Sequence, residues 1–171
     1  MRRFLDKDFV LISSLSPRTL NIPVCYDRQF GLDLDHLAKT RGLSHSDIIR
    51  LHTGREYQVF MLGFLPGFVY LGNSHDSLVF GRRPEPRLRV PASSVGLAGN
   101  QTGIYPSEAP GGWQIIGRTP IPIFLPTNDQ PFLFNPGDRV RFYDISHSEY
   151  LQIRKLEKPW SSLKIDIPTN D

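Results

Sequence analysis

The sequence predicts a mainly β protein, a closed or nearly closed β-barrel with two short helices before it. Three observations lead to this fold class. Short β-rich runs follow one another from Tyr57 to Tyr143. Turn-forming residues separate them, since the chain of 171 residues contains 14 Gly and 15 Pro. Apolar residues at helical spacing come before the strands, between Asp33 and Gly54. Many short strands punctuated at this frequency are typical of barrels.

The segment before the helices contains two β-rich runs. Phe9 to Ile12 is strand-like and leads into a Ser/Pro loop. Ile22 to Tyr26 follows and contains Pro23, which has no N–H to donate to a sheet ladder. We therefore expect this run at a sheet edge.

Two helices follow, each with a plausible stop signal. In the first, apolar residues recur at helical spacing at Leu34, Leu37 and Ala38, and Gly42 supplies a C-cap. The second begins at Ser44 or Ser46 and stops at Gly54.

The barrel strands are expected at 57–62, 88–91, 94–98, 101–105, 114–119, 132–134 and 139–143. After them we expect a short helix from Ser148 to Leu156 and a strand-like run from Leu163 to Ile167. No internal repeat interrupts this order. One barrel domain is the expectation for this length.

Composition excludes several classes of protein. With 39% hydrophobic and 22% charged residues, the chain has an ordinary soluble composition. No apolar run reaches the roughly 18 residues that cross a bilayer. Cys25 is the single cysteine, which excludes an internal disulfide and suggests a cytoplasmic location. The net charge of +3 is spread thinly, so we expect neither a nucleic acid nor a membrane partner.

The densest run of Gly, Pro, Arg, Tyr and Trp lies between Gly63 and Arg118. It holds GFLPGFVYLG (63–72), RRPEPRLRVPASSVG (82–96) and AGNQTGIYPSEAPGGWQIIGRTP (98–120), and PGDRVRF (136–142) follows. With IPVCYDRQFGLDL (22–34) and HTGREYQVFMLGF (52–64), these motifs resemble the family of KipI, the 5-oxoprolinase B subunit and allophanate hydrolase subunit 1. This carboxyltransferase-domain family has a cyclophilin-like C-terminal lobe.

The resemblance implies a domain division and a function. Residues 22–146 would be the cyclophilin-like domain, 1–21 a remnant of the usual N-terminal lobe or disordered, and 147–171 a C-terminal extension. The chain would be one component of an ATP-dependent 5-oxoprolinase complex that hydrolyses 5-oxoproline to glutamate. Its partners would be the C and A subunits of 5-oxoprolinase, and the ATP site would be shared with them, because no P-loop lysine follows the Gly-rich turns here.

The resemblance leaves two other functions open. KipI-type relatives inhibit a sensor histidine kinase, with Tyr70, Tyr105 and Trp113 as the aromatic anchors here. Allophanate hydrolysis in urea breakdown shares the same motifs. The helices between Leu34 and Gly54 also look like a helix-turn-helix, but the resemblance explains them as a connection into the barrel.

The chain departs from the family pattern at one turn in particular. Where the family usually reads VPAGSV, this chain has Ser93 in place of glycine. A positive φ at that position would reshape the turn, whereas a negative φ would make the change harmless. Gly81 and Arg82 also stand where Pro-Arg is usual.

Arg87, Arg118 and His52 are the candidate catalytic residues. Each arginine lies beside proline-bearing turns, and a guanidinium suits a carboxylate or phosphate. The alternative is that they pair with Asp or Glu at the barrel rim, while Arg82, Arg83 and Arg89 are solvated. His52 lies at a helix C-terminus, which would raise its pKa; it would then be an acid or base, or only a cap.

Gln101, Thr102, Tyr105 and Trp113 are the candidate substrate-binding residues. An amide, a hydroxyl and a phenol together orient a polar ligand, although turn bonding between Gly99 and Gly103 is the alternative. Trp113 would be a packing anchor admitted by its neighbouring glycines, or a cover over a ligand. No metal site is expected, because metal-ligand spacing is absent among His36, His45, His75 and His147.

Overall fold

The computed structural model describes residues 17–157, 160, 163 and 165–166, in which strands predominate. The strands are β1 (Thr19–Val24), β2 (Glu56–Leu62), β3 (Val69–Gly72), β4 (Arg87–Val90), β5 (Ser94–Ala98), β6 (Gln101–Ile104), β7 (Ala109–Gly111), β8 (Gln114–Arg118), β9 (Arg139–Asp144) and β10 (Ile165–Asp166). The helices are α1 (Leu34–Arg41), α2 (His45–Thr53) and α3 (His147–Arg154), with a 3₁₀ turn at Asp76–Leu78.

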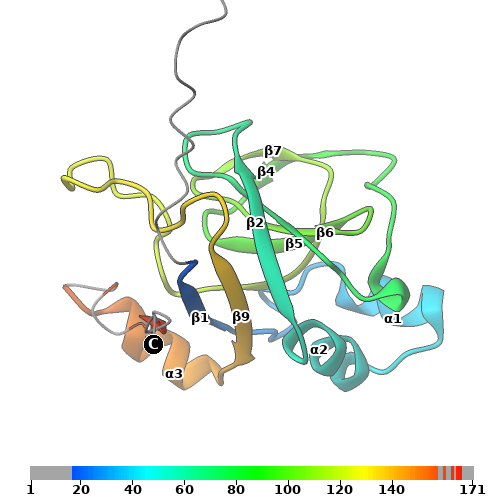
Figure 1. The fold of residues 1–171 in the computed structure, drawn as a ribbon. Coiled ribbons are helices and arrows are strands. Elements are labelled where there is room, and N and C mark those ends of the chain that lie inside the picture. Colours follow the sequence, from blue (N-terminus) through cyan, green and yellow to red (C-terminus); the bar gives the residue numbers. More distant parts are fainter. Residues whose placement is uncertain (1–16, 158–159, 161–162, 164, 167–171) are drawn as a thin grey trace, which may run out of the picture.

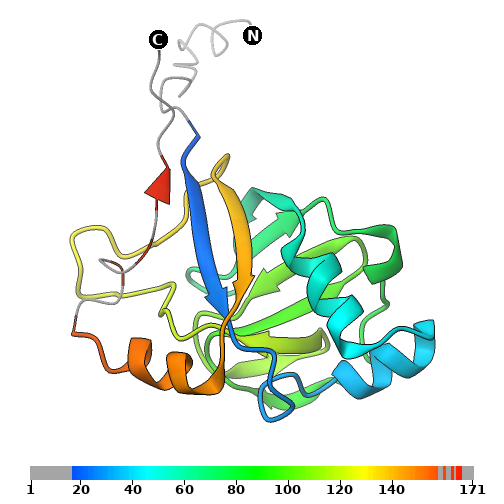
Figure 2. The same cartoon turned by 90° about the horizontal axis from the view of Figure 1, so that it is seen from below.

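An eight-stranded sheet in the order β10-β1-β9-β2-β3-β6-β5-β8 curls into a nearly closed barrel. β1 and β9 run parallel and lie side by side in Figure 2. The residue after β1 brings the two ends of the sheet together, because Cys25 and Arg118 exchange backbone hydrogen bonds of 2.9 and 3.0 Å. This closure confirms the mainly β barrel.

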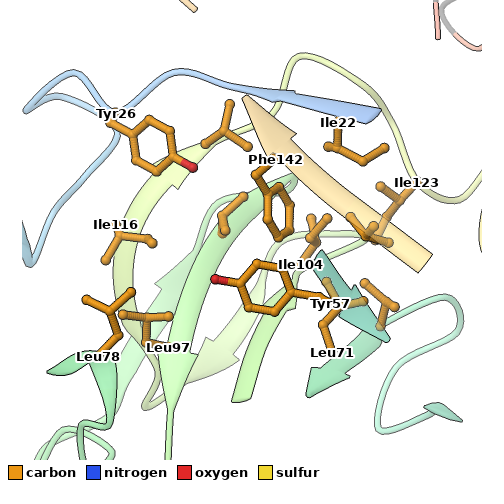
Figure 3. Close-up of a cluster of buried hydrophobic side chains, with 14 of the residues drawn as sticks. Ile22, Tyr26, Tyr57, Leu71, Leu78, Leu97, Ile104, Ile116, Ile123 and Phe142 are labelled. Atoms are coloured by element: carbon orange, nitrogen blue, oxygen red, sulfur yellow. The ribbon is translucent and has the colours of Figure 1, made fainter. Parts of the chain in front are cut away.

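The inner face of the sheet holds the larger hydrophobic cluster. Val95 and Ile104 are fully buried there, with Leu97, Ile116 and Phe142. Figure 3 shows the side chains of Leu97, Ile104, Ile116 and Phe142 converging. The hydroxyl groups of Tyr26 and Tyr57 also point into the cluster. Burial of this apolar surface is the main source of stability.

The helices have the ends expected from the sequence. Gly42 ends α1 in the left-handed conformation, with φ of 64°. Ser44, rather than Ser46, caps α2: its hydroxyl accepts from the Asp47 backbone, and the Asp47 side chain accepts from the Ser44 backbone. α1 and α2 lie together at one side of the barrel and α3 lies apart from them (Figure 1). No helix among the described residues is long and apolar enough to cross a bilayer.

A second, smaller layer covers part of the outer face. β4 and β7 form a separate two-stranded sheet. Beneath it, Phe68, Tyr105, Trp113 and Ile115 belong to a second buried cluster. The sheet therefore has a core on its inner face and an aromatic cluster on its outer face.

The strands predicted between residues 57 and 119 and at 139–143 are confirmed within one residue at each end. The run expected at 22–26 lies two to three residues earlier, as β1, and of the run expected at 163–167 the structure describes a strand at Ile165–Asp166. The expected strand at 132–134 is wrong, since Phe132 forms only an isolated bridge with Phe124. β3 and β7 were not expected from the sequence. Pro23 lies in β1, which is flanked by β9 and β10, but β10 pairs only with Thr19 and Leu20. The expectation of an edge strand is therefore wrong for β1 as a whole. Pro23 is tolerated because no β10 residue pairs with it, so no backbone N–H is needed on that side.

The ends of the barrel lie outside the expected boundaries. β1 begins at Thr19, so residues 19–21 are part of the sheet rather than a remnant. The segment after residue 146 is also integrated: Tyr150 of α3 is buried against Phe30 and Cys25, and β10 pairs with β1. The strand-like run expected at Phe9 to Ile12 lies outside the described residues.

Candidate outer-face site

Four of the expected site residues, Tyr105, Trp113, Arg118 and Gln101, lie on the outer face of the sheet. Val95 pairs with Ile104 and both point into the inner core. Alternation along a strand therefore directs their neighbours, Ser94 and Tyr105, to the outer face. The Tyr105 N–H donates to the Ser94 carbonyl at 3.0 Å. Ser94 in turn pairs directly with Arg118, so Tyr105, Ser94 and Arg118 form one row across three strands, the outer-face row.

A buried carboxylate fixes the arginine-bearing turn beside this row. Asp33 has a side chain only 2% exposed and accepts from both terminal nitrogens of Arg87 at 2.8 Å. Arg83 donates to the same carboxylate at 2.6 Å. The Ile115 N–H donates to it at 2.7 Å. This Asp33 clamp ties the turn before β4 to β8 and to the start of α1.

The clamp agrees with one of the two interpretations of Arg87. Arg87 pairs with an acid at the barrel rim, which was the alternative to anion binding. The expectation that Arg83 is solvated is wrong, because Arg83 shares Asp33 with Arg87. Asp33 itself was not singled out from the sequence. It is at the N-cap position of α1 but makes no side-chain capping bond, since its oxygens face the arginines.

Arg118 is placed differently from Arg87. Its side chain is half-buried and its Cζ lies 5.0 Å from the centre of the Phe30 ring. Its Nε is buried without a hydrogen-bond partner among the described residues. Ser94, opposite it, is fully buried, and its Oγ also has no partner in this part of the chain. Both groups are hydrogen-bond donors that the described residues leave unused.

Tyr105 and Trp113 pack tightly on the outer face. Tyr105 is 1% exposed and its phenol lies against Gly111 of β7. Burial raises the pKa of Tyr105, so the phenol stays protonated at neutral pH. Trp113 is confirmed as a packing residue, but the glycines that admit it are Gly96 and Gly103 on neighbouring strands rather than the two that precede it.

His52 and Thr102 lie on the inner face instead, in a buried polar chain. The Tyr26 hydroxyl is 2.7 Å from His52 Nδ1, and His52 Nε2 is 3.1 Å from Thr102 Oγ1. Thr102 donates its hydroxyl proton to the Gly96 carbonyl at 3.1 Å. Thr102 must therefore accept from His52 Nε2–H, and His52 Nδ1 accepts from Tyr26. Both ring nitrogens are occupied.

The expectation of a raised pKa for His52 is wrong. The side chain is fully buried, and desolvation lowers the pKa of His52 to about 3. The Phe142 ring stacks on the imidazole with centroids 4.5 Å apart. His52 is therefore a neutral core residue, and nothing in this arrangement lets substrate reach it.

The last expected residue, Gln101, is half-buried on the outer face at the β5–β6 hairpin. Because the register places Gly103 between Gln101 and Tyr105, Gln101 lies at the far end of the strand from the outer-face row. Of the expected residues, the structure therefore places Tyr105, Trp113 and Gln101 on the outer face with Arg118, holds Arg87 in the Asp33 clamp, and places His52 and Thr102 on the inner face.

A hollow among the described residues lies away from these side chains. A cavity of about 310 Å³ is lined by polar groups that include Glu56, Gln58, Asn73 and Arg139. Arg139 and Arg141 already pair with Glu56 at 2.6 and 2.9 Å. Within the described part of the chain, no three His, Cys, Asp or Glu side chains gather in a way that could hold a metal.

Comparison with known proteins agrees with this architecture. Residues 8–134 match the model of the carboxyltransferase domain, subdomain C and D. The chain belongs to this family. It is 48% identical over 133 residues to the 5-oxoprolinase B subunit of Bacillus subtilis (strain 168), covering 78% of this chain and 55% of that protein. It is 51% identical over 125 residues to the 5-oxoprolinase B subunit of Escherichia coli O157:H7, covering 73% and 57%.

A solved structure shares the fold. The conserved uncharacterized protein PH0987 from Pyrococcus horikoshii superposes with a TM-score of 0.75 at 48% identity, covering 77% of this chain and 61% of that one. A more distant match is the urea amidolyase of Saccharomyces cerevisiae, 32% identical over 126 residues, which cover 68% of this chain and 7% of that protein. The chain spans little more than half the length of the two 5-oxoprolinase components that it matches.

Proposed function

We propose that this chain acts in a 5-oxoprolinase complex, as the barrel-bearing part of its B subunit. The complex opens the lactam ring of 5-oxoproline to give glutamate and cleaves ATP. The similarity to two such B subunits, at 48% and 51% identity, supports the proposal. A protein that is one subunit of an enzyme works with partner chains, which we take to be the C and A subunits. The buried free Cys25 suits a reducing cytoplasm.

The observation that carries the proposal is the unpaired Arg118 guanidinium on the outer face. A lactam is stable in water, so transfer of a phosphoryl group to its oxygen creates the leaving group that hydrolysis needs. The substrate is an anion, and a fixed positive charge orients it. Arg118 supplies that charge, while the Asp33 clamp holds Arg87 and makes it a positioning residue.

ATP would be bound mainly by the partner proteins. The outer-face row offers one unpaired guanidinium, and the positive charges of Arg83 and Arg87 are already balanced in part by Asp33. A triphosphate carries several charges and is usually bound by a Gly-rich loop with a lysine and Mg²⁺. His52 is left out of the mechanism because it is a buried, neutral core residue.

Reconstitution tests the proposal. This chain is mixed with the A and C subunits of 5-oxoprolinase, and ATP hydrolysis is measured with and without 5-oxoproline. The proposal predicts ATP cleavage that depends on 5-oxoproline and disappears when this chain is left out. Equal ATP hydrolysis with and without 5-oxoproline would refute it.

Urea breakdown is a second candidate, favoured by the match to urea amidolyase at 32% identity. The same assay with allophanate in place of 5-oxoproline separates the two. Kinase inhibition is not favoured by any contact of the described residues, because two of its three expected anchors, Tyr105 and Trp113, are only 1% and 4% exposed.

A further inference from the structure

Three half-buried arginines of the barrel pair with acids, whereas Arg118 and Arg55 pair with none among the described residues. Arg18, Arg83 and Arg87 have side chains 27%, 31% and 21% exposed, and each pairs with a carboxylate within 2.8 Å. Arg118 makes neither a hydrogen bond nor an ion pair with the side chains described; it rests on the Phe30 ring, with a buried, unpaired Nε. A buried Nε–H without a partner has lost its water and gained no acceptor in return, which is unfavourable until an acceptor binds.

Ser94 is a second, independent unpaired group at the same place. It is fully buried, and its Oγ lacks a hydrogen-bond partner among the described residues. Directly opposed residues of an antiparallel pair have Cβ atoms roughly 5 Å apart on one face. Ser94 and Arg118 are such a pair. Buried polar groups without partners are uncommon, and two on directly opposed residues are a candidate place for an acceptor from outside the chain.

The donors define the class of ligand. A guanidinium edge and one hydroxyl match the two oxygens of a carboxylate. The nearby backbone amides cannot extend the site to a phosphate, because the Arg118 and Thr119 N–H groups each donate at 3.0 Å, to Cys25 and Ser93 carbonyls. We infer that Arg118 and Ser94 form a binding site for a single carboxylate group.

The inference deepens the proposed function but rests on it only for the identity of the carboxylate. Two sources share this chemistry: the carboxylate of a small substrate such as 5-oxoproline, and an Asp or Glu side chain of a partner protein. For both sources, binding should depend on Arg118 and Ser94. The two sources differ in whether a small carboxylate binds the free chain.

The small-molecule arm uses the full chain labelled with ¹⁵N. It is titrated with acetate, with 5-oxoproline, and with 2-pyrrolidinone, which keeps the lactam ring without the carboxylate. We expect saturable shifts of the Arg118 Nε–H and Ser94 backbone signals with the first two ligands only. Arg118→Ala should weaken binding at least tenfold. Arg118→Lys keeps the charge without the planar fork, so its affinity should lie between those of the unchanged chain and Arg118→Ala.

Two further variants separate binding from folding. Arg55 is also half-buried with an unpaired Nε, but it lies outside the outer-face row, so Arg55→Ala is the matched control and should bind as the unchanged chain does. Ser94→Ala removes a hydroxyl that has no partner among the described residues. It should leave the melting temperature unchanged or raise it, and still weaken carboxylate binding.

The partner arm measures association with the C subunit of 5-oxoprolinase. If neither small carboxylate binds the free chain, but Arg118→Ala and Ser94→Ala weaken association and Arg55→Ala does not, the carboxylate comes from the partner and the inference stands. Two results would overturn the inference. One is that 2-pyrrolidinone shifts the Arg118 and Ser94 signals as much as 5-oxoproline does. The other is that Arg118→Ala changes neither ligand binding nor association with the C subunit. Acetate binding at Arg118 without any 5-oxoproline-dependent ATP hydrolysis refutes the proposed function alone.

Discussion

Removal of the Asp33 carboxylate is the perturbation with the largest expected effect on stability outside the apolar core. In Asp33→Ala the buried Ile115 N–H loses its acceptor, which costs about 1–3 kcal/mol. Arg83 and Arg87 also lose their partner, but at 31% and 21% exposure they regain water. We therefore assign each arginine only about 0.5–1 kcal/mol. No capping energy is added, because Asp33 makes no side-chain cap.

The sum is a loss of about 3 kcal/mol in the free energy of unfolding. Urea denaturation followed by tryptophan fluorescence measures it, and with an m-value of about 2 kcal/mol/M the midpoint falls by about 1.5 M. Asp35→Ala is the matched control, since Asp35 lies in the same first turn of α1 but its side chain is 72% exposed. It should change stability by about 0.5 kcal/mol or less.

A double-mutant cycle checks that the loss comes from the clamp. Arg87→Ala should cost clearly less in the Asp33→Ala background than in the unchanged chain, because the shared bonds are already gone. If Asp33→Ala unfolds within about 1 kcal/mol of the unchanged chain, or no differently from Asp35→Ala, the account of the clamp is refuted.

Three other predictions concern single residues. His52 is neutral in the fold down to about pH 3, whereas an unfolded histidine binds a proton near pH 6.5. The free energy of unfolding should therefore fall by about 2 kcal/mol from pH 6.5 to 4.5, and His52→Gln should flatten this slope; an unchanged slope contradicts the assignment. Ser93 has φ of 63°, so Ser93→Gly should raise the free energy of unfolding, measured by urea denaturation, by about 0.5 kcal/mol. A lower free energy of unfolding would contradict the strain at Ser93. Gly103→Ala places a methyl group 2.9 Å from Trp113, so it should lower the free energy of unfolding by about 2 kcal/mol and alter tryptophan emission. Gly81→Ala meets open space and should change neither the stability nor the emission.

Local signals in the sequence sufficed for the helices and most of the strands. The caps at Gly42 and Ser44 are local, and the structure uses them. β3 was missed because Val69–Gly72 is a short run beside Pro66 and Gly67, and only pairing with β2 and β6 makes it a strand. The apolar run at 132–134 lacks such a partner strand among the described residues.

The candidate site was predicted in part, for the same reason. The composition of the loops pointed to Arg87, Tyr105 and Arg118, but not to what each one faces. Asp33 is 54 residues from Arg87 in the sequence, so no local pattern could pair them. The position of His52 at a helix end suggested a cap, and burial in the barrel overrides that suggestion.

Ser93 shows how one departure from the family pattern affects this site. Its φ of 63° is positive, so the replacement of glycine is not the harmless case: Ser93 takes the left-handed conformation that glycine adopts without strain. The Ser93 N–H donates to the Tyr105 carbonyl at 2.7 Å, and its carbonyl accepts from Thr119. Ser93 therefore bonds to Tyr105 of the outer-face row and to Thr119, which follows Arg118.

The central claim is that ligands meet the outer face of the barrel while the inner face is only core. A structure of the chain in complex with the C subunit of 5-oxoprolinase and 5-oxoproline tests it most directly. The account predicts a carboxylate within hydrogen-bonding distance of Arg118 and Ser94, with the bonds of His52 to Tyr26 and Thr102 unchanged. A ligand carboxylate or partner acid bound elsewhere, with Arg118 still unpaired, would contradict it.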